Sequence, residues 1–146
     1  MITFRSKNSN VKYDTYLLTD DERKLQAFYQ KLFAIAKEDV VAKGVMYDLQ
    51  YLNLSNPNYD ATKQFAWLRR FENETLLVVV NFDDANKNIK LNVIQEVFDF
   101  LGMRPKKRQL MKDLLSNKSC YKDFCPDTPL ELELNANSGI VFKFKN

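Results

Sequence analysis

The stretch FAWLRRFENETLLVVVNF, from Phe65 to Phe82, decides the fold. Aromatic residues alternate with aliphatic ones from Phe65 until Arg69 and Arg70, as in a strand with two different faces. Leu76 to Val80 is apolar at every position, which is typical of a strand covered on both faces. The polar break between the two runs has the length of a hairpin turn. The stretch therefore predicts a central pair of antiparallel strands.

Length and composition around this hairpin indicate one packed domain. The chain has 146 residues, of which 45% are hydrophobic, with 11 Phe and 7 Tyr. At this size folding buries about two thirds of the extended-chain surface, so an ordinary core suffices. No apolar run reaches the roughly 20 residues of a membrane span, and residues 1–18 lack the apolar centre of a signal peptide. We expect no membrane partner, whereas a cytoplasmic, periplasmic or secreted location depends on any sequence upstream.

The absence of histidine restricts the chemistry most. It excludes histidine-based triads, histidine-paired cysteine nucleophiles and zinc sites that need imidazole. Oxygen ligands in the Asp83–Asn88 loop make it a candidate calcium site. However, an EF-hand starting at Asp84 would need Gly and Glu where Ile89 and Gln95 stand. A polar turn explains this loop equally well, so we expect no metal and no cofactor. Cys120 and Cys125 could form a local disulfide or remain free thiols.

The region before the hairpin predicts a helix. Residues 1–18 form an irregular lead-in that could hold a short strand. Thr19 and Glu22 then match a capping box, in which each side chain bonds the other residue's backbone N–H. A broad apolar face follows at helical spacing, which predicts an amphipathic helix over about 20–38, with Gly44 closing the segment. The face consists of Leu25, Phe28, Tyr29, Leu32, Phe33, Ile35 and Ala36.

The remaining segments predict mostly strands. Residues 45–53 are extended in pattern, and residues 92–102 return to helical spacing with Gly102 at the C-terminal end. Leu130 to Leu134 alternates cleanly, and Ile140 to Phe144 is a second closing strand. The predicted fold is α+β and mainly β: an antiparallel β-sandwich preceded by one amphipathic helix, with a short helical insertion near 92–102. Residues 1–44 are the lead-in and helix, and residues 45–146 are the sandwich.

Two features favour particular binding partners. Trp67 and surface tyrosines such as Tyr121 could stack on sugar rings, as in a carbohydrate-binding module. A tryptophan within a Phe-rich strand is more often core, so we expect Trp67 to be buried, in the sandwich or between sheet and helix. The basic cluster RPKKR, from Arg104 to Arg108, could serve a nucleic-acid or protein interaction domain. A solvated loop explains the cluster better, so we expect no nucleic-acid partner.

The order of the segments resembles one known family. LQAFYQKLFAIAKED, followed by Gly44 and YDLQYLN, is similar to the last barrel helix of the alpha-amylase family of glycoside hydrolases and the chain just beyond it. FAWLRRFENETLLVVVNFDD resembles the hairpin that opens that family's C-terminal domain. MKDLLSNK followed by LELELNANSGIVFKF resembles the closing strands of the same domain. The similarity covers about residues 19–146; the insertion at 92–102 and the Cys120–Cys125 loop depart from it.

The resemblance implies a non-catalytic role for this chain. The family's catalytic carboxylates lie on strand ends of a (β/α)8 barrel, which needs about 200 residues or more. This chain has no positions that match them, so no catalytic residue is carried over. The implied function is to stabilise the catalytic barrel of the same parent chain, which would act on α-glucans such as starch and maltooligosaccharides. Without a barrel, the helix near 20–38 would leave an apolar face open, which predicts a homodimer through that helix.

Overall fold

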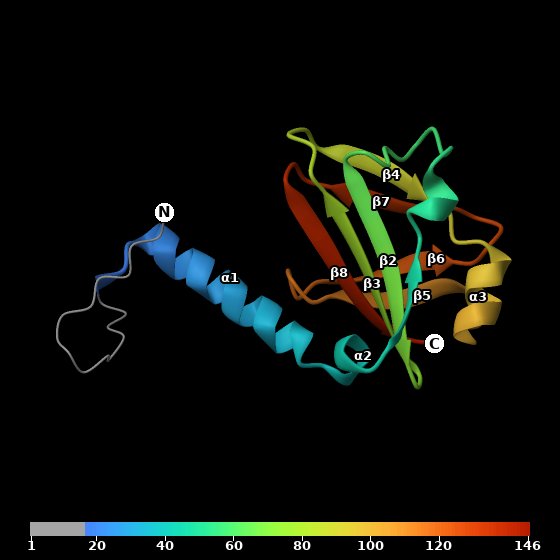
Figure 1. The fold of residues 1–146 in the computed structure, drawn as a ribbon, viewed down its shortest axis with the longest axis horizontal. Helices are drawn as coiled ribbons and strands as arrows, with labels where there is room; N and C mark the ends of the chain where they lie inside the picture. Colours follow the sequence, from blue (N-terminus) through green and yellow to red (C-terminus); the bar gives the residue numbers. More distant parts are fainter. Residues whose placement is uncertain (1–16) are drawn as a thin grey trace. The chain divides into compact units, whose positions relative to one another are not determined.

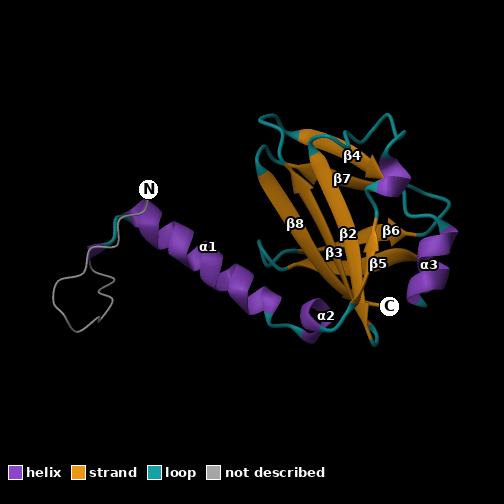
Figure 2. Ribbon diagram, in the orientation of Figure 1, coloured by secondary structure: helices purple, strands orange, loops and turns teal. Residues whose placement is uncertain are grey.

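A computed structural model describes residues 17–146, and the predicted irregular lead-in at 1–18, with its possible strand, lies almost wholly outside that range. The chain divides between Ile35 and Ala36 into two units, which are described separately (Figures 1 and 2). The larger unit contains every strand of the described chain.

Helix α1 spans Asp20–Ala36 and begins at the predicted capping box. The Glu22 N–H donates to Thr19 Oγ1 at 3.2 Å, and the Thr19 N–H donates to Glu22 Oε2 at 2.8 Å. Two backbone donors that the first turn leaves unpaired are satisfied in this way. The predicted helix is therefore confirmed, two residues shorter at its C-terminal end than expected.

The larger unit is a pair of antiparallel sheets with short helices around them (Figure 2). One sheet has six strands in the order β1-β2-β3-β8-β5-β6, and the other pairs β4 with β7. The strands are β1 (Val45–Asp48), β2 (Gln64–Phe71), β3 (Glu74–Asn81), β4 (Lys87–Leu91), β5 (Lys106–Asp113), β6 (Ser119–Phe124), β7 (Leu130–Leu134) and β8 (Ser138–Lys145). The helices are α2 (Asp39–Ala42), η2 (Tyr51–Asn53, a 3-10 turn) and α3 (Gln95–Leu101). The predicted α+β, mainly antiparallel fold is confirmed.

The predicted hairpin is the centre of the large sheet. Strand β3 pairs with β2 from Glu74 to Asn81 and with β8 over the same eight residues. Alternate residues of β3, such as Leu77 and Val79, enter the main core and are fully buried. The facing strand β7 contributes Leu130, Leu132 and Leu134 to that core, so the clean alternation of LELEL marks its buried side.

The helical insertion covers one end of this core. Val97 and Phe98 of α3 are fully buried, and the Phe98 ring lies 5.0 Å from that of Phe124. The helix ends at Gly102, whose φ of 64° is the left-handed conformation that glycine adopts without strain. The Met103 N–H then donates to the Phe98 carbonyl at 2.8 Å. The predicted insertion is confirmed, with its helical part limited to Gln95–Leu101.

Several segments differ from the predictions. The extended segment predicted over 45–53 ends at Asp48, because the Asp48 carboxylate accepts the Gln50 N–H at 2.8 Å and the chain turns into η2. The predicted loop at Asp83–Asn88 ends where β4 begins at Lys87. The RPKKR segment is not all loop, because β5 begins at Lys106. The Cys120–Cys125 segment is largely strand β6, and both cysteines are free thiols.

A buried carboxylate secures the turn after β3. The side chain of Asp83 is 4% exposed, and its Oδ2 lies 3.0 Å from Lys87 Nζ and 3.1 Å from Lys63 Nζ. Its Oδ1 accepts the Ala85 N–H at 3.2 Å. The hydrogen bond from Lys87, together with that from Lys63, holds the pKa of Asp83 below its usual range, although burial acts in the opposite direction.

This depressed pKa predicts a loss of stability in acid. Because the folded-state pKa of Asp83 lies below the unfolded value of about 3.9, the carboxylate stabilises the fold above that pH and ceases to do so as the pH falls further. Asp83→Asn should lower the urea midpoint at pH 7 and flatten its dependence on pH below about 4. Asp127→Asn, an exposed aspartate, is the matched control. An unchanged acid limb in Asp83→Asn would refute this account.

Candidate interaction surface

The large sheet has a second apolar face, directed away from the main core. Alternation along β2 places Phe65, Trp67, Arg69 and Phe71 on one side, opposite Ala66 and Leu68, which are fully buried in the core. The register brings Trp67 beside Val78 of β3, and Val78 in turn beside Val141 of β8. We call this side of the sheet the outer face. It consists of Phe65, Trp67, Arg69, Phe71, Leu76, Val78, Val80 and Val141.

Trp67 lies on this outer face, which corrects the expectation of a fully buried tryptophan. Its side chain is partly exposed, and its neighbour Phe65 is 38% exposed. The two rings lie 5.3 Å apart and are tilted against each other. Alternation correctly grouped Trp67 with Phe65, but the small and branched residues Ala66 and Leu68 occupy the core side instead. The outer face therefore presents a pair of aromatic rings.

The centre of the outer face is already apolar and partly covered. Leu76, Val78 and Val141 are 2%, 8% and 7% exposed, yet none of them belongs to the main core cluster. Helix α2 packs against β2 and β3, and its Val40 is fully buried. Gly44 permits this close packing, because a Cβ at that position would lie 2.1 Å from the Val40 carbonyl oxygen. The outer face is thus a second, smaller apolar layer.

Two cations lie beside this apolar centre. Lys143 Nζ lies 2.5 Å from Glu38 Oε2 and 3.1 Å from Glu74 Oε2, which ties the start of α2 to β8 and β3. Burial alone would lower the pKa of Lys143, but the bonds to both carboxylates outweigh it and raise that pKa. Arg69 donates from Nη2 to the Gly44 carbonyl at 3.1 Å. Its Nε is buried and has no hydrogen-bond acceptor among residues 17–146.

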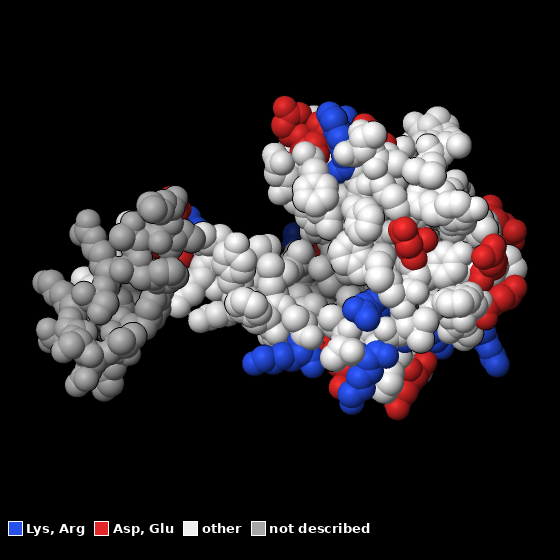
Figure 3. Space-filling model, viewed as in Figure 1, with Lys and Arg blue, Asp and Glu red and all other residues white. Residues whose placement is uncertain are grey.

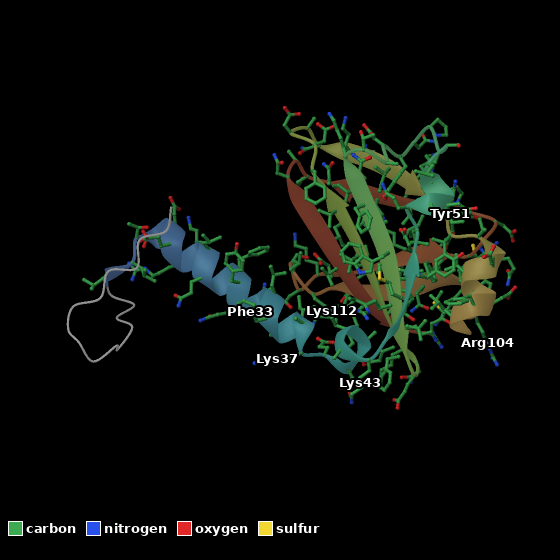
Figure 4. The ribbon with its side chains drawn as sticks, in the orientation of Figure 1. Phe33, Lys37, Lys43, Tyr51, Arg104 and Lys112 are labelled. Atoms are coloured by element: carbon green, nitrogen blue, oxygen red, sulfur yellow. The ribbon has the colours of Figure 1, made fainter. Side chains whose placement is uncertain are left out.

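Helix α1, considered by itself, carries another apolar face. No residue of this helix is buried. Leu25, Phe28, Tyr29 and Phe33 are 39%, 45%, 49% and 64% exposed, and Figure 4 shows Phe33 projecting from the helix. Phe28 and Tyr29 follow Leu25 by three and four residues, and Phe33 follows Tyr29 by four, so all four lie on one side of the helix. The helix therefore offers an apolar stripe of the kind that packs against another protein surface.

The second residue expected to contact sugar, Tyr121, lies elsewhere. Tyr121 belongs to β6, whereas Trp67 belongs to β2, and β3, β8 and β5 lie between these strands. At a strand spacing of about 4.8 Å, the two strands are about 19 Å apart. The structure therefore does not bring Trp67 and Tyr121 into one site. Tyr121 is 59% exposed and lines a separate hollow between β6 and the start of β7.

Neither a cluster of metal ligands nor a membrane-spanning helix is present among residues 17–146. Within residues 17–146, no group of three or more Cys, Asp or Glu side chains is arranged to hold a metal ion. In the loop after β3, Asp83 is engaged by two lysines instead. None of the helices in this range has the length and apolar character needed to cross a bilayer. In the view of Figure 3, much of the surface over the strands is uncharged, and charged side chains gather mainly near its rim.

The chemistry of the outer face is that of contact rather than catalysis. It combines exposed aromatic rings, branched apolar side chains and an arginine with spare donors, which are enriched where protein surfaces meet. The unbroken apolar run Leu76–Val80 predicts that both faces of this strand are covered, but it does not predict that the covering of one face is incomplete.

Comparison with known proteins finds a similar fold and no similar sequence. No protein-family model matches the chain, and no curated protein matches its sequence. Among solved structures, it is similar to the noncanonic maltogenic alpha-amylase AmyB of Thermotoga neapolitana, with a TM-score of 0.64 and 15% identity over 92% of this chain and 28% of that one.

Two further alpha-amylases give the same result. The alpha-amylase of Geobacillus thermoleovorans, solved with acarbose, matches with a TM-score of 0.61 and 14% identity over 89% of this chain and 25% of that one. AmyP, solved with maltose, matches with a TM-score of 0.62 and 11% identity over 90% and 23%. The chain thus spans about a quarter of the length of the structures it matches. At these identities the similarity establishes the fold: that of a mainly β region of alpha-amylase chains.

Proposed function

We propose that this chain is a non-catalytic domain that packs against, and stabilises, the catalytic (β/α)8 barrel of a parent glycosidase acting on α-glucans. The observation that carries the proposal is the outer face of the six-stranded sheet, where Phe65 and Trp67 remain partly exposed beside a buried apolar layer. Burial of such a face against a second domain removes apolar area from water, at about 25 cal/mol per Å².

Three features support an interdomain role. Arg69 is partly exposed on the outer face, so a carboxylate or carbonyl on a partner could accept a hydrogen bond from its guanidinium. Helix α1 carries a second apolar stripe with no buried residue. The structures of similar fold belong to alpha-amylases that are about four times longer, in which this region is one part of a larger chain.

The parent protein is the direct test of this function. An antibody raised against residues 36–146 should precipitate, from the source cells, a polypeptide much larger than 17.2 kDa that releases reducing sugar from starch. The purified 146-residue chain should release none, because it has no residues that match the barrel's catalytic carboxylates. Precipitation of a 17.2 kDa polypeptide alone, or starch hydrolysis by the purified chain, would contradict the proposal.

Substitutions on the outer face separate docking from folding. Phe65→Ser with Trp67→Ser should destabilise the isolated chain by about 2–4 kcal/mol, because each side chain is only partly exposed. In the parent, the same pair should cost a further 2–4 kcal/mol or so, which is typical of aromatic side chains at the centre of an interface. Thermal unfolding of both proteins measures the difference.

Tyr51→Ser is the matched control for this pair, since Tyr51 is 73% exposed on η2 (Figure 4) and does not belong to the outer face. It should change neither Tm by more than about 2 °C. Equal losses in the isolated chain and the parent would mean that the outer face contacts no second domain.

The apolar stripe of helix α1 predicts that the 146-residue chain, on its own, forms a dimer. Exposed apolar stripes of this kind tend to find partners, and a twofold dimer is the simplest closed arrangement. We expect sedimentation to show a dimer, and Phe28→Ser with Phe33→Ser to shift it to a monomer. Ala27→Ser with Gln30→Ser, on the opposite side of the helix, should leave the dimer intact. A monomeric wild-type chain at about 100 µM, where even contacts of −5 to −6 kcal/mol would be visible, would refute the prediction.

A further inference from the structure

Strand β1 is one edge of the six-stranded sheet, and part of its backbone is open to a further strand. In the described part of the chain it pairs with β2 alone. The Leu49 N–H, just beyond β1, donates to the Ala66 carbonyl at 3.0 Å. Because bonds in an antiparallel ladder come from alternate residues, Tyr47 also bonds to β2, whereas the N–H and C=O groups of Met46 and Asp48 point away from it. Both of these residues are exposed.

Exposed apolar side chains surround this open edge. The Phe100 ring of α3 lies 5.4 Å from the Tyr47 ring, edge to face. Phe100 and Tyr51 are 62% and 73% exposed. The other exposed apolar residues of β1, of the η2 region and of the chain leading into α3 are Val45, Met46, Leu54 and Ile94. We call this set of residues the edge patch. Apolar patches on a soluble protein mark surfaces that bind another molecule.

A buried asparagine holds the segments of the edge patch together. The Asn53 side chain is fully buried, and its Nδ2 donates to the Leu49 carbonyl at 2.8 Å and to the Asn92 carbonyl at 3.1 Å. Its Oδ1 accepts the Asn92 N–H at 2.9 Å. The Tyr47 hydroxyl donates to Glu96 Oε1 at 3.2 Å, which joins β1 to α3. The patch is therefore formed in advance, and a ligand does not bear the cost of ordering it.

The segments that form the edge patch carry carboxylates and no cations. Residues 45–59 and 91–103 contain no Lys or Arg, although the whole chain has a net charge of +3. Asp48, Glu96 and Asp99 are all exposed. Within residues 17–146, none of these three carboxylates forms an ion pair with a Lys or Arg side chain. The local charge therefore favours a ligand that combines apolar with basic side chains.

We propose that the β1 edge binds an extended segment of a partner protein, with apolar and basic side chains in alternation, which joins the large sheet as a further strand. The open backbone groups of Met46 and Asp48 supply hydrogen bonds to the segment, and the edge patch and its carboxylates select the side chains. A second copy of β1 fits less well, because it would bring its own carboxylates towards these ones.

This edge is independent of the proposed barrel docking. It includes neither the aromatic pair of the outer face nor the stripe of α1. Failure of a segment to bind at β1 would leave the docking proposal intact, and failure to dock would leave this one intact.

The test uses synthetic seven-residue peptides and the 146-residue chain labelled with ¹⁵N. In the first peptide lysine alternates with valine, with phenylalanine at the centre, and in the second glutamate replaces each lysine. The lysine peptide should shift the amide signals of Met46 and Asp48 and slow their hydrogen exchange, with a Kd of about 0.1–1 mM. The glutamate peptide should bind at least about tenfold more weakly. Proline in place of the central phenylalanine should weaken binding as much, because it removes a backbone donor.

Variants of the chain assign the binding to this edge. Met46→Pro should abolish the shifts and preserve the fold, because the N–H that it removes is not bonded to β2. Asp99→Lys should weaken binding of the lysine peptide and strengthen that of the glutamate peptide, each at least about threefold. Asp127→Lys, which changes another exposed aspartate, is the matched control and should change neither affinity. If Met46→Pro does not fold, Phe100→Ser is the second variant and should weaken the lysine peptide at least about fivefold.

Four results would overturn the proposal. These are the absence of shifts at Met46 and Asp48 with the lysine peptide at about 5 mM, equal affinity for the lysine and glutamate peptides, and an unchanged affinity in the folded Met46→Pro or Phe100→Ser variant. The fourth is a set of shifts at β1 that depends on protein concentration without any peptide, because a second copy of the chain would then occupy the edge.

Discussion

Strand β3 is hydrogen-bonded on both edges and apolar on both faces, and the rest of the domain depends on that double constraint. Its full length from Glu74 to Asn81 pairs with β2 on one side and β8 on the other. Leu77 and Val79 face the main core, whereas Leu76 and Val78 face the opposite side, and all four are 8% exposed or less. No position in the middle of this strand can carry a charge without leaving it buried and unpaired.

The double covering of β3 explains why the domain has two apolar layers. The main core closes against β4, β7 and α3, which are supplied by the same chain. The opposite layer is closed only in part, by the four-residue helix α2 and by the ion pairs of Lys143. Phe65 and Trp67 continue this layer beyond its cover. The surface proposed to contact a partner is thus an extension of the internal packing.

The sequence predicted the parts whose signals are local. The capping box at Thr19, the apolar run Leu76–Val80, the alternation of LELEL and Gly102 each indicate one element without reference to distant residues. Strands β4, β5 and β6 were missed because KNIKL, KKRQLMKD and SCYKDF have no clear apolar alternation. Strands β4 and β5 form by pairing with β7 and β8, which lie far along the chain, and β6 then pairs with β5. Alternation placed Trp67 and Phe65 on one face, but it does not show on which side of the sheet the core lies. The β5–β6 bulge between Lys106 and Gln109, where Arg108 adopts a φ of 54°, contains no glycine that would have predicted it.

The order of strands in the large sheet has a consequence for the making of the protein. Strand β8 is the last strand of the chain, yet it lies between β3 and β5 in the interior of the sheet. Until β8 leaves the ribosome, one edge of β3 is unpaired, and no strand joins β5 and β6 by hydrogen bonds to the hairpin of β2 and β3. A nascent chain in this state displays an apolar strand with unpaired backbone groups, the kind of surface that chaperones cover and that otherwise aggregates. We therefore expect the six-stranded sheet to assemble only after β8 (Ser138–Lys145) has left the ribosome.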